Sequence, residues 1–384
     1  MIHIKVYNVL LLEAEYRKVL PVVRAFARKG HNVYTVSLNK FSIGGSSKYV
    51  KKNYFVEQLT VQNVLEIVEK HNIDVIIPSN EKSVELLSSN EDKFIVPLVT
   101  PSMESYLICR DKLKTIQFAE KLGVRVPKTF TFKDYEDFKD HFDKIDISPL
   151  VLKPKSSAGS RGLLYIDNKE QLLNTLTKDY IDKYGFPLIQ ERIPSGGRPV
   201  GSSFLYYDGQ EVLGFCHQRL REYPPSGGPS TLAVSIYDQK ALDIGRKLLN
   251  NLKWNGLAMV EFKEDPRTSE LVLMEINPRM WGTIGLAIFS GADFTDAIVK
   301  VFLENVDPND VDKEYKSGCY FRWVFPGDIM SIMLSKNLTA GQKFRELFRR
   351  YDNVTYQIAE KGDVKPIFAM LMYSIAKQFG HIIQ

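Results

Sequence analysis

Hydrophobic and polar positions along the first hundred residues alternate between strand-like and helix-like patterns. Short apolar runs are separated by longer amphipathic segments, and Gly30 ends the first of these segments. Strands that alternate with helices at this spacing are typical of β-α-β units, which build a parallel sheet covered by helices. We therefore predict a parallel-sheet domain over residues 1–105, with ligands expected at the carboxyl ends of its strands. The predicted strands are 4–12, 32–38, 73–78 and 94–99, and the predicted helices are 14–29, 61–71 and 80–89.

Two loops of this region are weak site candidates. Residues 42–47 are rich in Ser and Gly, and Ser79, Asn80 and Glu81 follow the third predicted strand. An ordinary loop or a helix cap accounts for each of them at least as well. No GxGxxG pattern follows the first strand, which disfavours dinucleotide binding.

A second segment, 106–188, places two lysines at the ends of regular elements. Lys112 lies at the start of an expected helix, and Lys153 ends an apolar strand. The loop 155–162 follows Lys153, and its small residues let backbone N–H groups approach an anion closely. A flap over phosphates fits this loop, and a plain flexible hairpin fits it about equally. A Walker loop is excluded because the GxxxxGK[ST] pattern is absent.

Two long antiparallel strands are predicted at 201–208 and 211–220, with an Asp-Gly turn between them. Alternation with a period of two puts His217, Arg219 and Arg221 on one face at the end of the second strand. Three basic groups on one face suit anionic ligands. The alternative is a solvated strand edge.

The segment 255–282 is predicted to form a β-hairpin that carries acidic groups on otherwise apolar faces. Its polar turn is centred near Thr268, which sets Glu261 opposite Glu275. Neighbours of this kind have Cβ atoms about 5–8 Å apart, and like charges at that distance are destabilising. We therefore expect a positive group between them. One face of the first strand carries Leu257, Met259 and Glu261, and one face of the second carries Leu271, Leu273, Glu275 and Asn277.

The expected positive group is a divalent ion. Two carboxylates and the Asn277 amide, with no His or Cys nearby, are oxygen ligands of the kind that Mg²⁺ prefers, and Mn²⁺ is compatible with the same set. Arg279 follows on the same edge and is suited to neutralise charge on a transferred phosphoryl group. A solvated hairpin with its acids in water is the alternative, which the interleaved leucines and methionine disfavour.

Composition and charge exclude several classes of protein. The 384 residues are 44% hydrophobic and 25% charged, as in an ordinary globular protein, and a net charge of +5 is too mild to indicate nucleic-acid binding. Three widely separated cysteines predict neither a disulfide framework nor a zinc site, so a reduced, cytoplasmic protein is expected. The N-terminus does not read as a signal peptide, and no apolar run reaches the length of a transmembrane segment. An apolar stretch at 366–379 is expected to pack as an amphipathic helix, with attachment to a membrane surface or a partner as a minor alternative.

The order of these motifs resembles the ATP-grasp superfamily. The similarity covers roughly residues 1–305 and concerns the branch that contains biotin carboxylase, carbamoyl phosphate synthase and carboxylate-amine ligases. It implies an α/β architecture that is α+β in the ATP-binding part. The implied units are an N-terminal Rossmann-like domain at 1–105, a small flap-bearing domain at 106–188, an antiparallel-sheet catalytic domain at 189–305 and an extension of unknown role at 306–384.

The resemblance also implies roles for individual residues. Lys112 and Lys153 would contact the α- and β-phosphates of ATP, and Ser156, Ser157, Gly159, Ser160, Arg161 and Gly162 would form the flap over them. Gln190, Glu191 and Ile193 would receive adenine, His217, Arg219 and Arg221 would face phosphates, and Glu261, Glu275 and Asn277 would bind Mg²⁺. Arg279 would steady a carboxylate or acyl phosphate, and the catalytic group would comprise Arg279, Arg219 and Lys153.

One departure from the family pattern leaves the ribose contact unassigned. Related ligases often have an acid shortly after the adenine segment, whereas this chain has Gly-Gly-Arg-Pro at 196–199.

The activity that the resemblance implies is the ATP-dependent joining of a carboxylate to an amine through an acyl phosphate, with release of ADP and phosphate. The alternative is activation of bicarbonate or carbamate, as in biotin carboxylase or carbamoyl phosphate synthase. An ATP-binding regulator without turnover and a nucleic-acid binder are the remaining hypotheses. The expected partners are small-molecule carboxylates and amines, and a homodimer is compatible with the resemblance.

Overall fold

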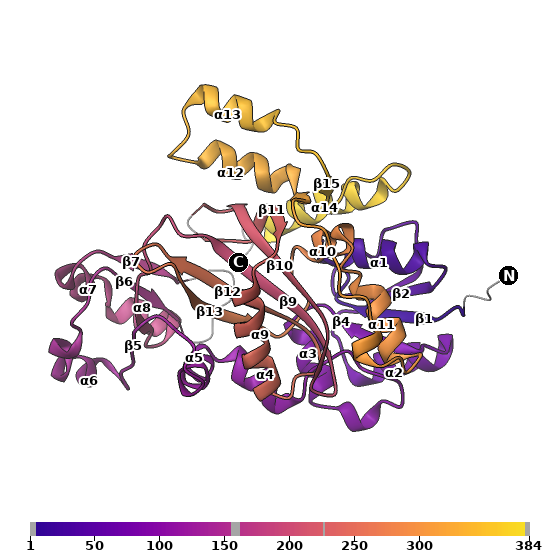
Figure 1. Ribbon diagram of the computed structural model, residues 1–384, viewed down its shortest axis with the longest axis horizontal. Coiled ribbons are helices and arrows are strands. Elements are labelled where there is room, and N and C mark those ends of the chain that lie inside the picture. The colour runs from indigo at the N-terminus through magenta and orange to yellow at the C-terminus, as the bar shows by residue number, and fades with distance from the viewer. Residues whose placement is uncertain (1–4, 155–161, 226, 381–384) are drawn as a thin grey trace.

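The computed structural model describes residues 5–154, 162–225 and 227–380. Three β-sheets and their helices form the body of the molecule, and the C-terminal residues cross over one end of it (Figure 1). The described part mixes parallel and antiparallel sheets, so the predicted α/β class with an α+β portion is confirmed.

The N-terminal residues form a four-stranded parallel sheet with the strand order β3-β2-β1-β4. This sheet confirms the predicted repeat of β-α-β units. β3 was not predicted, because its exposed lysines leave no apolar run, and the strand predicted at 94–99 is reduced to a single bridge between Ile76 and Leu98. The elements are β1 (Asn8–Leu12), α1 (Val19–Arg28), β2 (Asn32–Ser37), β3 (Val50–Phe55), α2 (Val61–His71), β4 (Val75–Pro78) and α3 (Glu81–Ser88).

Two helices, α4 (Met103–Arg110) and α5 (Lys112–Lys121), lead to a small antiparallel sheet with the order β5-β8-β6-β7. A separate apolar cluster that includes Phe138, Leu150 and Leu172 fills the space between this sheet and its helices. The Thr177 hydroxyl accepts from the backbone N–H of Tyr180 and so caps one of these helices. The elements are β5 (Thr129–Phe130), α6 (Tyr135–Asp140), β6 (Leu150–Lys153), β7 (Leu164–Ile166), α7 (Lys169–Thr175), α8 (Lys178–Tyr184) and β8 (Leu188–Glu191).

The largest sheet has seven strands in the order β13-β12-β9-β10-β11-β14-β15. All neighbours are antiparallel except β14 and β15, which run parallel. β11 was not among the strands predicted from the sequence. The elements are β9 (Pro199–Tyr207), β10 (Gln210–Glu222), β11 (Ser230–Ile236), α9 (Gln239–Asn251), β12 (Gly256–Asp265), β13 (Glu270–Asn277), α10 (Ile284–Ser290), α11 (Phe294–Phe302), β14 (Tyr320–Arg322) and β15 (Val354–Tyr356).

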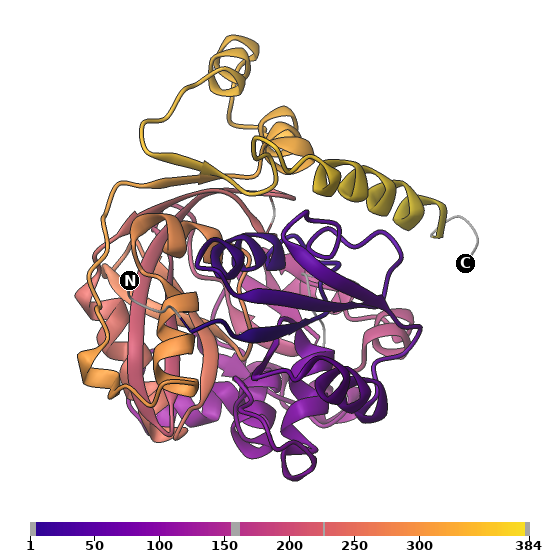
Figure 2. The same ribbon diagram turned by 90° about the vertical axis from the view of Figure 1, so that its right-hand side faces the viewer.

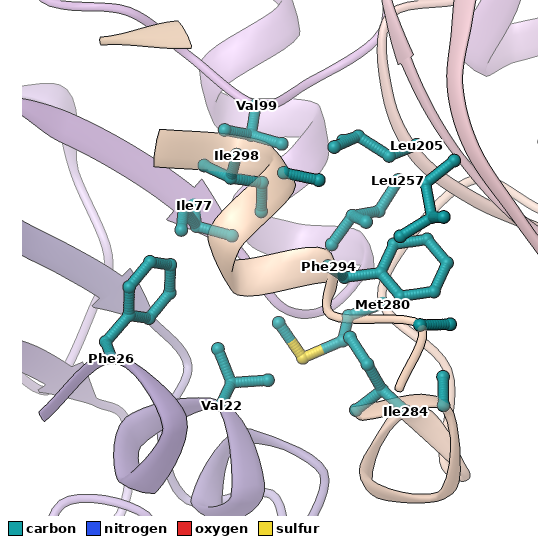
Figure 3. Packing of buried hydrophobic residues seen from close by; sticks show 14 of the residues in the cluster. Val22, Phe26, Ile77, Val99, Leu205, Leu257, Met280, Ile284, Phe294 and Ile298 are labelled. Carbon is teal, nitrogen blue, oxygen red and sulfur yellow. The ribbon is translucent and has the colours of Figure 1, made fainter. Parts of the chain in front are cut away.

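One hydrophobic cluster joins the N-terminal sheet to the largest sheet. Figure 3 shows Phe26 of α1 and Ile77 of β4 on one side, and Leu257 of β12 on the other, with Ile298 of α11 between them. Burial of this much apolar surface holds the two sheets in a fixed relation. The chain that leaves β13 therefore passes the carboxyl ends of β1 and β4.

The C-terminal extension, residues 306–380 of the described chain, packs across this junction. It adds β14 and β15 to the largest sheet and ends in α14 (Lys365–Gly380), which runs beside the N-terminal sheet (Figure 2). Arg24 of α1 is buried against the extension, where its guanidinium contacts Asp363 at 3.0 Å. Two further helices of the extension are α12 (Ile329–Leu334) and α13 (Ala340–Leu347). No described helix is both long and apolar enough to cross a membrane.

Candidate functional site

The acidic hairpin, which we define as β12, β13 and the turn between them, has the predicted register. Glu261 lies opposite Glu275, and Met259 lies opposite Asn277. Asp265 shapes the turn, because its carboxylate accepts from the backbone N–H of Arg267 at 3.0 Å. A turn stabilised by its own side chains fixes the register of both strands.

One part of the predicted hairpin is wrong. The pairing steps from Glu261 opposite Glu275 to Phe262 opposite Leu273, so Met274 is an extra residue in β13. A bulge of this kind moves the side chains beyond it to the other face of the strand. Leu271 and Leu273 therefore pack in the cluster of Phe262 instead of sharing the face of Glu275. The face of β13 that carries Glu275 is therefore more polar than a strict period-two alternation along the strand predicts.

The two carboxylates are joined by an amide. Asn277 Nδ2 donates to Glu261 Oε1 at 2.9 Å and to Glu275 Oε1 at 3.1 Å. Arg219 of β10 approaches from the side, with Nη2 2.9 Å from Glu261 Oε2. Burial raises the pKa of Glu261, and the Arg219 charge opposes that rise. The arrangement keeps two like charges close together by placing donors between and beside them.

The acidic hairpin forms one wall of a large cavity. The volume of this cavity is about 830 Å³, and its walls come from the small sheet, the largest sheet and the helices that precede them, with Glu81 of α3 as the contribution of the N-terminal region. Nine of the predicted site residues line it, which are Lys112, Lys153, Ile193, His217, Arg219, Glu261, Glu275, Asn277 and Arg279.

Two lysines enter the cavity from the small sheet and the helix before it. Asp111 caps α5 through bonds to the N–H groups of Leu113 and Lys114 at 2.9 and 3.1 Å, and this cap positions Lys112 at the first turn. Lys153 ends β6, and burial lowers the pKa of its ammonium to about 8, with the Glu275 charge opposing the shift. Lysines at these positions suit the recognition of phosphate oxygens.

His217 differs in character from the cationic group that the sequence suggested. Its ring is buried beside Gly201, and Nε2 lies 3.2 Å from Thr283 Oγ1. Burial, assisted by the Arg219 charge, lowers the pKa of the imidazole to about 3. The histidine is therefore neutral at physiological pH and acts as a polar, uncharged part of the wall.

Arg221 lies apart from the cavity. Leu220 is an extra residue in β10 opposite β11, and this bulge turns Arg221 to the other face of the sheet. There its guanidinium contacts Asp328 at 2.7 Å and Glu346 at 2.7 Å. The prediction that Arg221 shares a face with His217 and Arg219 is wrong, and the residue links β10 to the C-terminal extension.

The segment predicted to receive adenine is only partly at the cavity. Gln190 is buried and donates to Thr129 Oγ1 at 2.8 Å, whereas Glu191 forms an ion pair with Arg267. Ile193 lines the cavity, and its carbonyl accepts from Lys263 Nζ at 2.9 Å. Glu191 would have to leave its ion pair to contact a ligand, whereas the buried Gln190 Oε1 has no hydrogen-bond partner among the described residues.

Most of the predicted flap lies outside the described residues. This applies to Ser156, Ser157, Gly159, Ser160 and Arg161. Gly162 is described, and its carbonyl accepts from the Tyr180 hydroxyl at 2.7 Å. This bond ties the end of the loop to α8.

The sequence analysis missed several residues of the cavity wall. Lys263 lies on the same face of β12 as Glu261, and period-2 alternation from Glu261 could have found it. Glu81, by contrast, was one of the site candidates after the third predicted strand; it begins α3, lines the cavity and lies 3.5 Å from Arg279 Nε. Glu222 also lines the cavity, but it follows the bulge in β10, and nothing in the sequence signals that bulge.

Comparison with known proteins identifies the domain. The family model described as "ATP-grasp in the biosynthetic pathway with Ter operon" matches residues 216–324, which include His217, Arg219 and the whole acidic hairpin. The chain contains an ATP-grasp domain. The chain is 22% identical over 282 residues to the carbamoyl phosphate synthase large chain of Thermotoga neapolitana, and 21% identical over 263 residues to the arginine-specific large chain of Bacillus subtilis. These matches cover 69% and 66% of the chain but only 25% of each relative.

Solved structures share the fold of this ATP-grasp chain at low sequence identity. The biotin carboxylase domain of Hydrogenobacter thermophilus 2-oxoglutarate carboxylase has a TM-score of 0.63 at 15% identity, and the match covers 82% of this chain and 74% of that one. N5-carboxyaminoimidazole synthetase from Staphylococcus aureus has a TM-score of 0.65 at 13% identity, with coverage of 82% and 80%. The first structure was solved as a domain dimer with MgADP, ADP and bicarbonate, and the second with ADP. The ATP-grasp architecture expected from the sequence is therefore confirmed.

Proposed function

We propose that this protein is an ATP-dependent ligase that joins a carboxylate to an amine and releases ADP and phosphate. The observation that carries the proposal is the cavity wall in which Glu261, Glu275 and Asn277 meet opposite the lysines. Acids on one side and cations on the other suit a nucleotide triphosphate with its divalent ion. The similarity to ATP-grasp proteins supports the same proposal.

The donor set fits Mg²⁺. Two carboxylates converge on one amide group, and the polar atom between them is the positively polarised Nδ2 of Asn277. A divalent ion is a stronger positive partner for the same carboxylates, and turning the amide would present its oxygen. When bound, Mg²⁺ would supply charge neutralisation for the phosphate oxygens of ATP. Glu261, Glu275 and Asn277 would hold it, and the same oxygen ligands are compatible with Mn²⁺.

The side chains around the acids would position the reacting groups. Lys112 and Lys153 bind the α- and β-phosphates in the proposal, and Arg219 holds Glu261 in place while offering charge to the terminal phosphate. Arg279 steadies the substrate carboxylate at the edge of the cavity. Catalysis then consists mainly of orientation and charge neutralisation, because the reacting groups are anions that repel each other.

The reaction proceeds in two displacements. A carboxylate oxygen of the substrate attacks the γ-phosphorus of ATP, the bond to the bridging oxygen breaks, and ADP leaves. The amine nitrogen then attacks the acyl carbon, phosphate leaves, and the nitrogen loses a proton. The flap at 156–162 and the segment at 190–193 are proposed to cover the phosphates and the adenine respectively.

Activation of bicarbonate or carbamate is the second candidate. The relatives favour it, because several of them are carbamoyl phosphate synthase large chains and one solved structure contains bicarbonate. In this case bicarbonate would take the place of the organic acid beside Arg279.

The test is a screen for ADP and phosphate release. Purified protein with Mg²⁺ and ATP would be given a panel of organic acids and amines, and in parallel bicarbonate with the same amines. Release that needs an organic acid and an amine supports the ligase, and release that needs only bicarbonate supports the second candidate. Tight MgATP binding without turnover in every arm would contradict both proposals and favour a regulator.

Sedimentation would test whether two copies associate, as in the dimeric biotin carboxylase domain.

A further inference from the structure

A group of cationic side chains lies at the carboxyl ends of β1 and β4, beyond the acidic hairpin. Lys18 Nζ donates to the Met280 carbonyl at 3.0 Å and to Asn80 Oδ1 at 3.2 Å, and Arg279 donates to the same carbonyl at 3.2 Å. Arg17 lies next to Lys18 in the loop between β1 and α1. Three basic side chains therefore gather where the N-terminal sheet meets the exit of β13.

Arg17 is held by the C-terminal extension. Its guanidinium lies 3.7 Å from the ring centre of Trp323, and its Nε donates to Gln357 Oε1 at 2.8 Å. Gln357 is itself fixed, because its Nε2 donates to the carbonyl of Gly282 at 2.9 Å. We call this group of four residues, Arg17, Trp323, Gln357 and Gly282, the Arg17 corner.

The outer edge of the Arg17 guanidinium has no protein partner among the described residues. No acid of the described chain lies within 4.0 Å of Arg17, and neither Nη atom has a hydrogen-bond acceptor there. Nη2 lies 3.8 Å from the position that a Cβ on Gly282 would occupy, and Gly282 lines the large cavity. The guanidinium is thus stacked on one face and bonded at Nε, and its Nη2 lies beside Gly282 of the cavity wall.

Such a guanidinium is prepared to bind an anion. Arginine recognises carboxylates and phosphates through two parallel N–H donors, and stacking on an aromatic ring fixes the plane of those donors in advance. The nearby acids do not satisfy it. Glu13 uses one carboxylate oxygen on Ser83, at 2.7 Å, and Glu81 lies beside Arg279.

We propose that the Arg17 corner binds an anionic group, a carboxylate or a phosphate, of the substrate whose reacting carboxylate lies beside Arg279. This inference rests on the proposed function for the reaction at Arg279, and it adds that the substrate carries a second negative charge. Arg17 contacts the substrate, whereas Trp323 and Gln357 are positioning residues. The C-terminal extension thereby becomes part of the substrate site.

The experiment measures anion binding directly. Malonate and inorganic phosphate are titrated calorimetrically into the full chain, both alone and after saturation with Mg²⁺ and a non-hydrolysable ATP analogue that fills the triphosphate site. We expect R17A to weaken the binding of the preferred anion at least tenfold in both states, and R17K to weaken it less. Tighter binding of malonate would indicate that the substrate group is a carboxylate, and tighter binding of phosphate would indicate that it is a phosphate.

Two further variants separate positioning from folding. W323F retains an aromatic face and should bind the anion nearly as the wild type does, whereas W323A should bind it several-fold more weakly. R28A is the matched control, because Arg28, at the end of α1, also contacts the extension, at Glu360, but its side chain is 56% exposed. We expect R28A to leave anion binding unchanged.

The outcomes are distinguishable from failure of the proposed function. Anion binding that is the same in R17A and in the wild type, or no anion binding in any state, overturns the Arg17 corner as a subsite, even if the nucleotide analogue binds. Loss of anion binding in R17A with no nucleotide binding in the wild type supports the subsite and contradicts the ligase.

Discussion

The acidic hairpin lines the large cavity and the Arg17 corner adjoins that cavity through Gly282, but the two are assembled over very different lengths of chain. In the hairpin, Asn277 bridges carboxylates that are 2 and 16 residues away. In the corner, Arg17 is bonded to Gln357, 340 residues later. The first site depends on one turn and its register, whereas the second exists only after two distant segments have packed together. A substitution in the hairpin should therefore lower turnover, whereas a substitution that weakens the attachment of the extension should lower the free energy of unfolding.

The largest expected effect is the loss of turnover in E275Q. The substitution removes one of two negative charges from the proposed ion site while keeping the size of the side chain, so we expect ADP formation to fall at least about 1,000-fold. Rate measurements under saturating MgATP would show it. E270Q is the control, because Glu270 lies on the same strand and forms an exposed pair with Arg125 at 2.9 Å. Turnover of E275Q within tenfold of the wild type would contradict the ion site.

The second effect concerns the attachment of the extension. Asp328 is fully buried and accepts from Arg221 Nε at 2.7 Å and from Arg322 Nε at 2.6 Å. D328A would leave two arginines without their shared acid, so we expect the free energy of unfolding to fall by about 3–5 kcal/mol. Urea denaturation measures this change.

The control for this experiment is D352A, since Asp352 is an exposed residue of the same extension. A loss in D328A no larger than in D352A would show that the extension is held mainly by its apolar contacts. Either result sharpens the contrast with the hairpin, whose E275Q variant should keep its stability.

The third effect is a dependence of nucleotide affinity on pH. Burial lowers the pKa of Lys153 to about 8, so its ammonium loses the proton as the pH rises through 8. Binding of the triphosphate favours the protonated form, and affinity should therefore be about tenfold weaker at pH 9.5 than at pH 7. Titration with a fluorescent nucleotide analogue would measure it. In K153Q the decrease should be much smaller, and an equally steep decrease would assign the effect to another group.

The smallest effect is expected at His217. Because the pKa of this buried imidazole is about 3, the side chain carries no charge that phosphates could use near neutral pH. We expect H217N to change nucleotide affinity less than about threefold, a loss comparable with one neutral hydrogen bond. R219M is the comparison, since Arg219 remains charged and contacts Glu261. A loss in H217N as large as that in R219M would show that the histidine is protonated in the complex.

The contrast between the two regions also explains what the sequence could predict. The parallel sheet and the pairing of Glu261 with Glu275 follow from local periodicity and one polar turn. The bulges at Met274 and Leu220 do not, because one extra residue in a strand leaves no mark on composition. These two insertions account for the wrong faces assigned to Leu271, Leu273 and Arg221.

The Arg17 corner could not be found by pattern at all. Arg17 lies among ordinary polar residues, and its partners Trp323 and Gln357 belong to a segment that matches no motif used in the sequence analysis. Their proximity results from the hydrophobic packing that joins the sheets and from the burial of Arg24 against the extension. Contacts between segments that are far apart in the chain cannot be predicted from the local pattern of a single sequence.

The amide of Asn277 holds Glu261 and Glu275 together through two internal hydrogen bonds. We therefore expect treatment with a chelator to leave the melting temperature unchanged. Under the proposed function, a divalent ion at this site would replace an internal donor, so the stability of the fold and the binding of the ion would be largely separate properties.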